Sequence, residues 1–288
     1  MKNKTPKTDL ETLARQCGAR YIPFHAAPKA HWQSPPELQA IEAQLSQALH
    51  LRSVLLLTGP NGVGKSALVK RWLESLDTRR HVPLVVTQAT LSGSSLLSLL
   101  THKLGKTPSC RRDRNLQRIE EALAELEPRI PLILLDEAQH YPCGALEEVR
   151  LLLGLNLASQ PVFALTMISD DYFLKTLAMQ HHRALFSRIA YSLSLQPWTR
   201  DTIEDYLTQS LKGAGLSQFN IEPAAVDLLA SASAGLPRSL SQLARSAWIH
   251  TAQQSETEIT AQHVQEAMKT VPCLPGNQLP PIPSIDET

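Results

Sequence analysis

The sequence predicts an α/β protein in which a doubly wound parallel sheet is followed by a smaller, all-helical domain. The first observation is an apolar run at 54–57 that leads through a glycine-rich loop into a helix-like stretch. The second is an alternation of short apolar runs with helix-length segments, which continues to about residue 195. The third is the loss of strand patterns from Gln196 onward, where only helical periodicity remains. Alternating strands and helices are typical of a parallel sheet with helices on both faces.

The individual elements follow from apolar spacing and from residues that begin or end helices. A first helix is expected at about 36–50, because Ile41, Leu45 and Leu49 share one face. Strands are then expected near 53–58, 83–88, 130–136 and 162–169, with helices near 65–75, 94–104, 114–126 and 144–153. In the C-terminal part, helices are expected at 199–211 (closed by Gly213), 223–232, 237–253 and 260–268, with Thr199 and Thr260 as N-caps.

Composition limits the class of protein. A chain of 288 residues can form a full α/β core and one smaller domain. The formal net charge of +1 gives no overall attraction to polyanions, so a nucleic-acid site would have to be a local patch. No apolar stretch approaches the roughly 20 residues of a membrane span, and no apolar region follows the Lys-rich start. We therefore expect a cytoplasmic protein without membrane contact.

Four cysteines are present: Cys17, Cys110, Cys143 and Cys273. They are widely scattered and lack the C-x-x-C spacing that metal and redox motifs share. The sequence therefore predicts reduced thiols rather than a metal site or a disulfide framework.

The loop after the first strand has the spacing G-x-x-x-x-G-K-S of a phosphate-binding loop. Its residues, with the first that follows, are Gly59, Pro60, Asn61, Gly62, Val63, Gly64, Lys65, Ser66 and Ala67. Glycines let backbone N–H groups point at phosphate oxygens, and the helix N-terminus adds positive dipole. We expect Lys65 to reach the β- and γ-phosphates of ATP and Ser66 to bind Mg²⁺. The strand–loop–helix context disfavours the alternative, a glycine-rich turn without nucleotide.

A second apolar run, at 131–135, ends in Asp136 and Glu137, which is a Walker B pattern. Asp136 is expected in the Mg²⁺ shell, and Glu137 is expected to orient and polarise the attacking water. A kinase does not need such a group, so the pair favours ATP hydrolysis. The alternative is two solvated acids that cap a strand.

Three arginines are candidates for contact with the γ-phosphate. Arg183 and Arg188 lie in the expected loop 181–189, and either could act as an arginine finger toward a neighbouring protomer. The alternative is that both merely decorate a solvated helix end. Arg238 is in the first turn of a predicted helix after Gly235-Leu236-Pro237 and is a candidate sensor 2 residue.

These features predict four regions. Residues 1–35 form an N-terminal arm whose patch Tyr21-Ile22-Pro23-Phe24 packs on or beside the nucleotide site, and 36–195 form the nucleotide-binding core. Residues 196–271 form a small helical lid. Residues 272–288 hold several prolines and little that could build a core, so they are predicted to be a flexible extension.

The motifs together resemble one group of AAA+ ATPases. G-x-x-x-x-G-K-S, L-L-D-E-A-Q, the S-R-I loop, G-L-P-R-S-L and the final I-T-A-Q-H-V-Q-E-A helix look like the ATPases grouped around ExeA, TnsC, TniB and MuB. The likeness covers about 21–269. By this resemblance Glu137 matches the catalytic glutamate, Arg188 the arginine of the family's Q-R-I motif and Arg238 the sensor 2 residue.

The sequence departs from the family pattern at sensor 1. The usual element after the fourth strand is replaced by Ile168-Ser169-Asp170-Asp171, so Ser169 and Asp170 are the candidates, with Thr166 behind them. An acid near the γ-phosphate repels it, so we expect slow hydrolysis that DNA or a partner stimulates.

Two functions remain open. ExeA-type secretion ATPases carry a membrane span and a periplasmic part after the lid, and transposition regulators are compact and about this size. The resemblance therefore favours a transposition regulator that assembles on duplex DNA as a hexamer- or heptamer-like ring or a helical filament, with a transposase and a TniQ-like targeting protein as partners. The alternative is a DNA-independent AAA+ switch in secretion, assembly or defence.

Local support for DNA binding comes from a basic cluster. It is formed by Lys103, Lys106, Arg111 and Arg112, with Arg114 beside them. In the family this side of the core lines the DNA channel, where such residues would contact phosphates without reading bases. The alternative is a solvated charged loop.

Overall fold

The computed structural model describes residues 10–25, 34–154, 161–271 and 274–275. The chain divides into two compact units, a core unit of residues 36–196 and a helical unit formed by the N-terminal residues up to Pro35 together with the chain from Pro197 onward. Within the described residues, none of the helices combines the length and apolarity needed to cross a bilayer.

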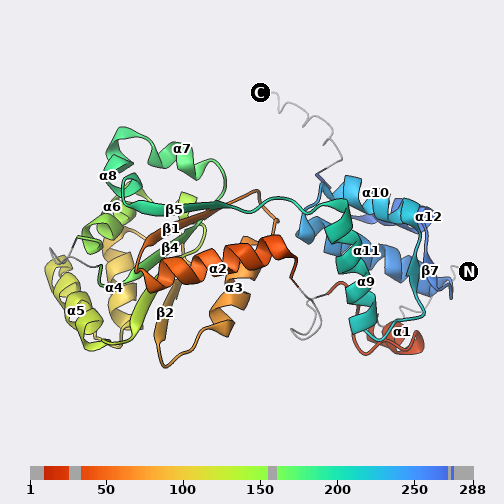
Figure 1. Ribbon diagram of the computed structural model, residues 1–288, viewed down its shortest axis with the longest axis horizontal. Helices are drawn as coiled ribbons and strands as arrows, with labels where there is room; N and C mark the ends of the chain where they lie inside the picture. The colour runs from red at the N-terminus through yellow and green to blue at the C-terminus, as the bar shows by residue number, and fades with distance from the viewer. Residues whose placement is uncertain (1–9, 26–33, 155–160, 272–273, 276–288) are drawn as a thin grey trace, which may run out of the picture. The chain divides into compact units, whose positions relative to one another are not determined.

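The core unit is built on a five-stranded parallel sheet with the order β2-β3-β4-β1-β5 (Figure 1). The strands are β1 (Val54–Thr58), β2 (His81–Val86), β3 (Ile130–Leu135), β4 (Ala164–Ile168) and β5 (Ile189–Ser194). The first four were expected from the sequence, and β2 begins two residues before its expected start. The predicted doubly wound parallel sheet is confirmed.

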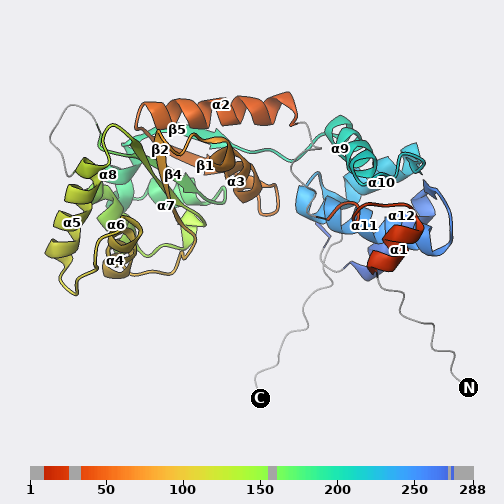
Figure 2. The same cartoon turned by 90° about the horizontal axis from the view of Figure 1, so that it is seen from below.

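Helices cover both faces of this sheet, as Figures 1 and 2 show. The core helices are α2 (Pro36–His50), α3 (Lys65–Ser75), α4 (Gly93–Lys103), α5 (Arg112–Glu125) and α6 (Cys143–Leu152). Leu55 and Leu57 of β1 pack with α2 and α3, whereas Leu56 packs with α4, α5 and α6. The alternation follows from the two-residue period of a strand, and it makes β1 buried along its whole length.

The segment between β4 and β5 is more structured than the sequence suggested. It holds the short helices α7 (Phe173–Leu177) and α8 (Arg183–Phe186), with the 3₁₀ turn η2 (Gln180–His182) between them. The expected loop 181–189 is therefore largely helical, and its last residue begins β5. The strand β5 was not among the expected strands, which were all continuous apolar runs, whereas residues 189–194 alternate between half-buried and exposed positions.

The helical unit contains α1 (Leu10–Gln16), α9 (Arg200–Gly213), α10 (Pro223–Ser233), α11 (Pro237–Gln253) and α12 (Ala261–Thr270). Trp248 of α11 is fully buried in the core of this unit. Thr199 caps α9 by accepting a hydrogen bond from the backbone N–H of Thr202, as expected. Gly213 does not close this helix but is its last residue, and the left-handed residue that follows the helix end is Gly215.

A two-residue parallel pair that the sequence did not predict also belongs to the helical unit. It joins β6 (Asn220–Ile221) to β7 (Glu258–Ile259). Because the pair is so short, it leaves no two-residue periodicity in the sequence.

The two ends of the chain contribute to the same helical core. Leu13, Ala14, Ala19 and Phe24 are buried among residues of α9 to α12, so residues 10–25 are a structural part of the helical unit. Apolar burial explains this placement, because this segment carries side chains that an exposed arm would leave in water. Leu274 is also buried there. The rest of the predicted extension at 272–288 lies outside the described residues, apart from Pro275.

Candidate nucleotide-binding and hydrolysis site

The glycine-rich loop 59–66 connects the carboxyl end of β1 to the N-terminus of α3. Gly59 has φ +148°, and a Cβ at this position would lie 2.6 Å from the carbonyl oxygen of Leu195. Gly64, the N-cap of α3, has the left-handed φ of +101°. Both positions therefore require glycine, one because a backbone passes close by and the other because of its conformation. The loop brings the first N–H groups of α3 to the edge of the sheet where ligands bind in α/β folds.

Lys65 is the first residue of α3, and its ammonium group turns back onto the loop. Nζ donates hydrogen bonds to the carbonyl oxygens of Gly59 (2.6 Å) and Pro60 (3.1 Å), and the residue is only 8% exposed. Burial lowers the pKa of Lys65, and nearby carboxylates, first among them Glu137, oppose that shift. A partly desolvated cation that contacts two carbonyl oxygens and lies near carboxylates is suited to an anionic ligand that carries its own divalent cation.

Ser66 and Asp136 meet although they are 70 residues apart. Ser66 Oγ donates to Asp136 Oδ1 at 3.3 Å, which joins the first turn of α3 to the residue after β3. A hydroxyl and a carboxylate oxygen are ligands that Mg²⁺ accepts. The structure therefore brings together the two residues that the sequence predicted as Mg²⁺ ligands.

Glu137 has an unusual backbone for a residue with a side chain. Its φ of +52° is in the left-handed region, and its N–H donates to Asp136 Oδ1 at 3.0 Å. A non-glycine residue in this region stores strain, and such residues cluster at functional sites. The side chain of Glu137 is exposed, whereas Asp136 is half-buried. The two neighbouring carboxylates are thus held in different environments.

Gln139 links Glu137 to the end of a neighbouring strand. It lies in the 3₁₀ turn η1 (Ala138–His140), and its Nε2 donates to Glu137 Oε2 at 2.7 Å. Its Oε1 accepts from the backbone N–H of Asp170, which follows β4, at 3.3 Å. The sequence reasoning gave Gln139 no role. The sequence feature that could have indicated it is a glutamine two residues after the Walker B acids. One 3₁₀ turn places that glutamine next to Glu137.

The two sensor 1 candidates both have local partners. Ser169 is 1% exposed, and its Oγ donates to the carbonyl oxygen of Asp170 at 3.1 Å. Asp170 Oδ1 accepts from the N–H groups of Tyr172 (3.1 Å) and Phe173 (3.0 Å), so this carboxylate caps the first turn of α7. Thr166 is buried within β4. In this structure the group that contacts both Glu137 and the end of β4 is Gln139.

The three candidate arginines are all exposed. Arg188 Nη1 donates to the carbonyl oxygen of Arg150 near the C-terminus of α6, at 2.6 Å. Arg183 is the first residue of α8. Arg238 is the second residue of α11 and so belongs to the helical unit. The core unit by itself therefore unites Lys65, Ser66, Asp136 and Glu137, whereas none of the arginines is placed against them within that unit by a described contact.

The basic cluster predicted to bind DNA is on α4, α5 and the loop between them, and most of its charges are paired. Lys106 contacts Glu125 at 2.7 Å, Arg111 contacts Asp113 at 2.7 Å, and Arg112 contacts Glu148 at 2.6 Å. Lys103 is exposed at the end of α4, and none of the ion pairs between described residues includes it. These acids offset most of the cluster's positive charge.

Comparisons with known proteins agree with this geometry. Residues 48–177 match the family model described as "AAA domain". General secretion pathway protein A of Aeromonas hydrophila is 27% identical over 190 residues, which cover 64% of this chain and 34% of the relative. The chain thus spans about a third of the length of the curated relative it matches.

Solved structures share the fold at low identity. The ORC2 protein of Aeropyrum pernix, in ADPNP and ADP complexes, has a TM-score of 0.63 and 15% identity, covering 87% of this chain and 69% of that chain. The Aeropyrum pernix ORC1 protein in complex with DNA has a TM-score of 0.60 and 21% identity, covering 89% and 69%. RuvB of Thermotoga maritima has a TM-score of 0.55 and 18% identity, covering 81% and 68%.

The matched residues 48–177 include the phosphate loop, the Asp136–Glu137 pair and Gln139. The predicted AAA+ fold is confirmed by the sheet order and by these structural neighbours. The chain therefore has the fold of AAA+ P-loop NTPases, and its residues 48–177 are similar to the AAA domain of the matching family model.

Proposed function

We propose that the core unit hydrolyses ATP with the help of Mg²⁺. The observation that carries this proposal is the meeting of Ser66 with Asp136 beside Lys65 and the strained Glu137. Lys65 would exchange its two loop carbonyls for phosphate oxygens, and Ser66 and Asp136 would hold Mg²⁺, which neutralises phosphate charge when bound. Glu137 would orient the attacking water and accept its proton. Hydrolysis of radiolabelled ATP by the purified chain, with and without Mg²⁺, tests this step.

Self-assembly is the second part of the proposal. Around the arginines at 183 and 188, the α7–α8 segment exposes three large apolar side chains: Tyr172, Met179 and Phe186. Several exposed large apolar side chains on one segment fit a protein interface. We assign Arg188 as the arginine finger that contacts the ATP of a neighbouring protomer in a ring or helical filament. Arg183 is the alternative candidate for this role. Arg238 would report the γ-phosphate to the helical unit as sensor 2.

The finer function rests on the sequence resemblance. The ATP-bound form would assemble on duplex DNA without reading its sequence and would recruit and stimulate a transposase, with a TniQ-like protein as a further candidate partner. The solved complex of the ORC1 protein with DNA supports DNA as a partner for this fold. The basic cluster on α4 and α5 is the surface we assign to the DNA phosphates. Its acid partners would have to be displaced by phosphates on binding.

A specific observation favours a second candidate. The curated relative with 27% identity is a secretion protein, and the ion pairs of Lys106, Arg111 and Arg112 leave little net positive charge on the proposed DNA surface. Both features fit a AAA+ switch that acts on another protein without DNA. The two candidates differ in whether ATP-dependent assembly requires duplex DNA.

Variants that remove either the acids or the basic residues of this surface distinguish the two candidate functions. If the surface binds DNA, the double variant Glu125→Gln with Glu148→Gln removes the acid partners of Lys106 and Arg112 and should strengthen binding to any duplex. Replacing Lys103, Lys106, Arg111 and Arg112 by Ala should weaken binding to all sequences alike and lower the salt slope by close to 0.9 per lost contact. The matched control is Arg79→Ala, an exposed arginine in an ion pair with Asp77 outside the cluster.

Binding is measured by fluorescence anisotropy with a labelled duplex, a non-hydrolysable ATP analogue and a series of salt concentrations. A charge-removal variant with the affinity and salt slope of wild type would exclude this surface as the DNA site. Wild-type protein that hydrolyses ATP and oligomerises but ignores duplex DNA would favour the secretion-type switch. Wild-type protein without ATPase activity would contradict the catalytic assignment itself.

A further inference from the structure

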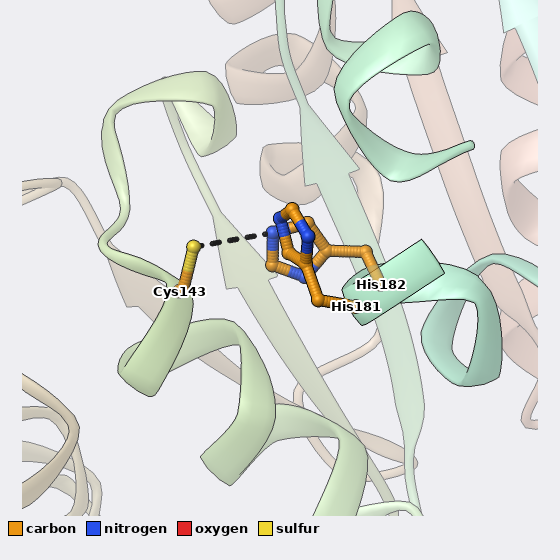
Figure 3. Close-up of side chains that lie close together, drawn as sticks. All are labelled: Cys143, His181 and His182. Atoms are coloured by element: carbon orange, nitrogen blue, oxygen red, sulfur yellow. Dashed lines mark hydrogen bonds between the residues drawn. The ribbon is translucent and has the colours of Figure 1, made fainter. Parts of the chain in front are cut away.

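A cysteine and two histidines meet on the core unit, outside the nucleotide site. Figure 3 shows Cys143, His181 and His182 with their side chains turned toward one another. Cys143 is the first residue of α6, and the two histidines belong to η2. Cys143 Sγ lies 3.5 Å from His182 Nε2, and one ligand atom of each of the three residues lies within 4.8 Å of the others.

The geometry is close to that of a tetrahedral transition-metal site. Two ligands bound to one zinc ion at 2.0–2.3 Å are about 3.5 Å apart, which is the separation already found between Cys143 and His182. The remaining separations are at most 4.8 Å, and the side chains of Cys143 and His181 are exposed, so rotation about their χ angles can close the distance.

The surroundings suit a metal ligand set rather than a plain thiol–imidazole contact. His182 is 5% exposed, and its ring meets that of His181 at 4.2 Å between centroids with an interplanar angle of 62°. A pair of Cys143 with His182 alone would not account for a second imidazole at the same point.

We propose that Cys143, His181 and His182 bind one divalent transition-metal ion of the zinc class, with a fourth coordination position left for water or an exchangeable ligand. Thiolate and imidazole are the ligands that zinc selects, whereas Mg²⁺ prefers oxygen, so this site is chemically distinct from the one at Ser66 and Asp136. On binding, the Cys143 thiol releases its proton to solvent as the sulfur–metal bond forms.

A bound ion would cross-link the start of α6 to the turn η2 within the core unit. Cys143 begins the helix that follows the Walker B acids, and His182 directly precedes α8, the helix before Arg188. Metal would hold the start of α6 against η2 and so limit how far this segment can move. The site thus offers a way for metal availability to act on the segment that carries Arg183 and Arg188.

Cobalt is the probe, because a cobalt–thiolate bond absorbs strongly in the near ultraviolet and tetrahedral Co²⁺ gives intense visible bands. The full chain, without an affinity tag and without nucleotide, is reduced, treated with chelator, desalted and titrated with Co²⁺. We expect saturation at one equivalent, the charge-transfer band of a sulfur ligand, and loss of the visible spectrum when Zn²⁺ is added.

Variants assign the ligands. Cys143→Ser should abolish the charge-transfer band, and His181→Asn should weaken Co²⁺ binding by at least about 100-fold, more than a lost outer-shell contact costs. Both side chains are exposed, so the variants should fold, which far-ultraviolet circular dichroism checks. The matched controls are Cys110→Ser and His102→Asn, an exposed cysteine and an exposed histidine elsewhere in the core unit, and both should bind as wild type does.

Three results would overturn the assignment. The first is a wild-type chain with no charge-transfer band. The second is a band that survives Cys143→Ser or disappears with Cys110→Ser. The third is rapid alkylation of Cys143 by iodoacetamide in a chain that gives no cobalt spectrum, which would identify the group as an activated thiol without a metal.

Discussion

Gln139 Nε2 donates a hydrogen bond of 2.7 Å to Glu137 Oε2, so the proposed catalytic carboxylate does not stand alone. The same glutamine accepts a hydrogen bond from Asp170 N, which follows β4. Because β4 lies between β3 and β1 in the sheet, Gln139 reaches from the Walker B acids toward the strand beside the phosphate loop. An orienting contact of this kind fixes where a carboxylate can meet a water molecule.

Variants of Glu137 and Lys65 should distinguish an effect on the hydrolysis step from an effect on ATP binding. In the Glu137→Gln variant we expect ATP affinity close to wild type and a turnover lower by about 10²- to 10⁴-fold, the range for a lost general base. In Lys65→Ala we expect ATP affinity to fall by more than about tenfold, because a charge-assisted contact is lost. Isothermal titration with ATP analogue and steady-state ATPase rates measure the two effects. Equal loss of affinity in both variants would contradict these roles.

Gln139→Ala should slow hydrolysis through Glu137. We expect turnover to fall by about 10- to 100-fold with ATP affinity unchanged, because the carboxylate loses its orienting donor. In the Glu137→Gln background the same change should cost nothing further, which a double-mutant cycle of turnover detects. Additive losses in the double variant would mean that Gln139 acts independently of Glu137.

Asp170 combines a helix cap with a charge near Lys65. Asp170→Ala should lower the free energy of unfolding by about 1 kcal/mol, because the N–H groups of Tyr172 and Phe173 at the start of α7 lose their acceptor. Asp170→Asn keeps that acceptor, so its stability in urea should match wild type. Its ATP affinity should rise, because one negative charge that acts on Lys65 is removed.

The control for Asp170 is Asp171→Ala, which removes another charge acting on Lys65 at an exposed position where no cap is described. It should raise ATP affinity without loss of stability. If Asp170→Asn instead keeps ATP affinity but loses most of its turnover, then Asp170 acts as the sensor 1 residue and its capping contacts are secondary.

Arg188→Ala tests assembly. If Arg188 contacts the ATP of a neighbour, monomer ATP affinity should stay near wild type while ATP-dependent oligomers and turnover decline, turnover by about 10³-fold or more. Mass photometry with ATP analogue follows the oligomers. A small loss of stability with normal oligomers would mean that Arg188 only binds the Arg150 carbonyl, and Arg183→Ala would then be the variant expected to lose turnover.

Features carried by neighbouring residues were predictable from the sequence. The phosphate loop and the Walker B pair are contiguous motifs, and α11 has the predicted bounds because Pro237 opens it and its apolar spacing is regular. The strand β5 was missed although Ile189, Tyr191 and Leu193 alternate with smaller residues, which is the two-residue period of a half-buried strand. Its pairing with β1 is a long-range contact, so the place of β5 at the edge of the sheet was not predictable from this pattern.

Groups of side chains that are distant in the sequence but meet in the fold were harder to predict. Cysteine spacing gave no sign of a metal-binding group, because the partners of Cys143 are two histidines that lie in another element, His182 being 39 residues later. The acids that pair with Lys106 and Arg112 are similarly distant, at Glu125 and Glu148, so the basic run looked less neutralised in the sequence than it is in the fold. Sequence patterns indicate local structure, whereas the Cys143 group and these ion pairs depend on how separate helices pack against each other.

The close contact at Gly59 has a consequence for anyone who wishes to re-engineer the connection between the two units. Leu195 N donates to Thr58 O at 2.9 Å, and the Leu195 carbonyl occupies the space that a Cβ on residue 59 would need. The backbone at Leu195, where the chain leaves the core, therefore packs directly against the start of the phosphate loop. A spacer should be inserted after Gln196, because extra residues placed before Leu195 would displace this packed backbone and, with it, the phosphate loop.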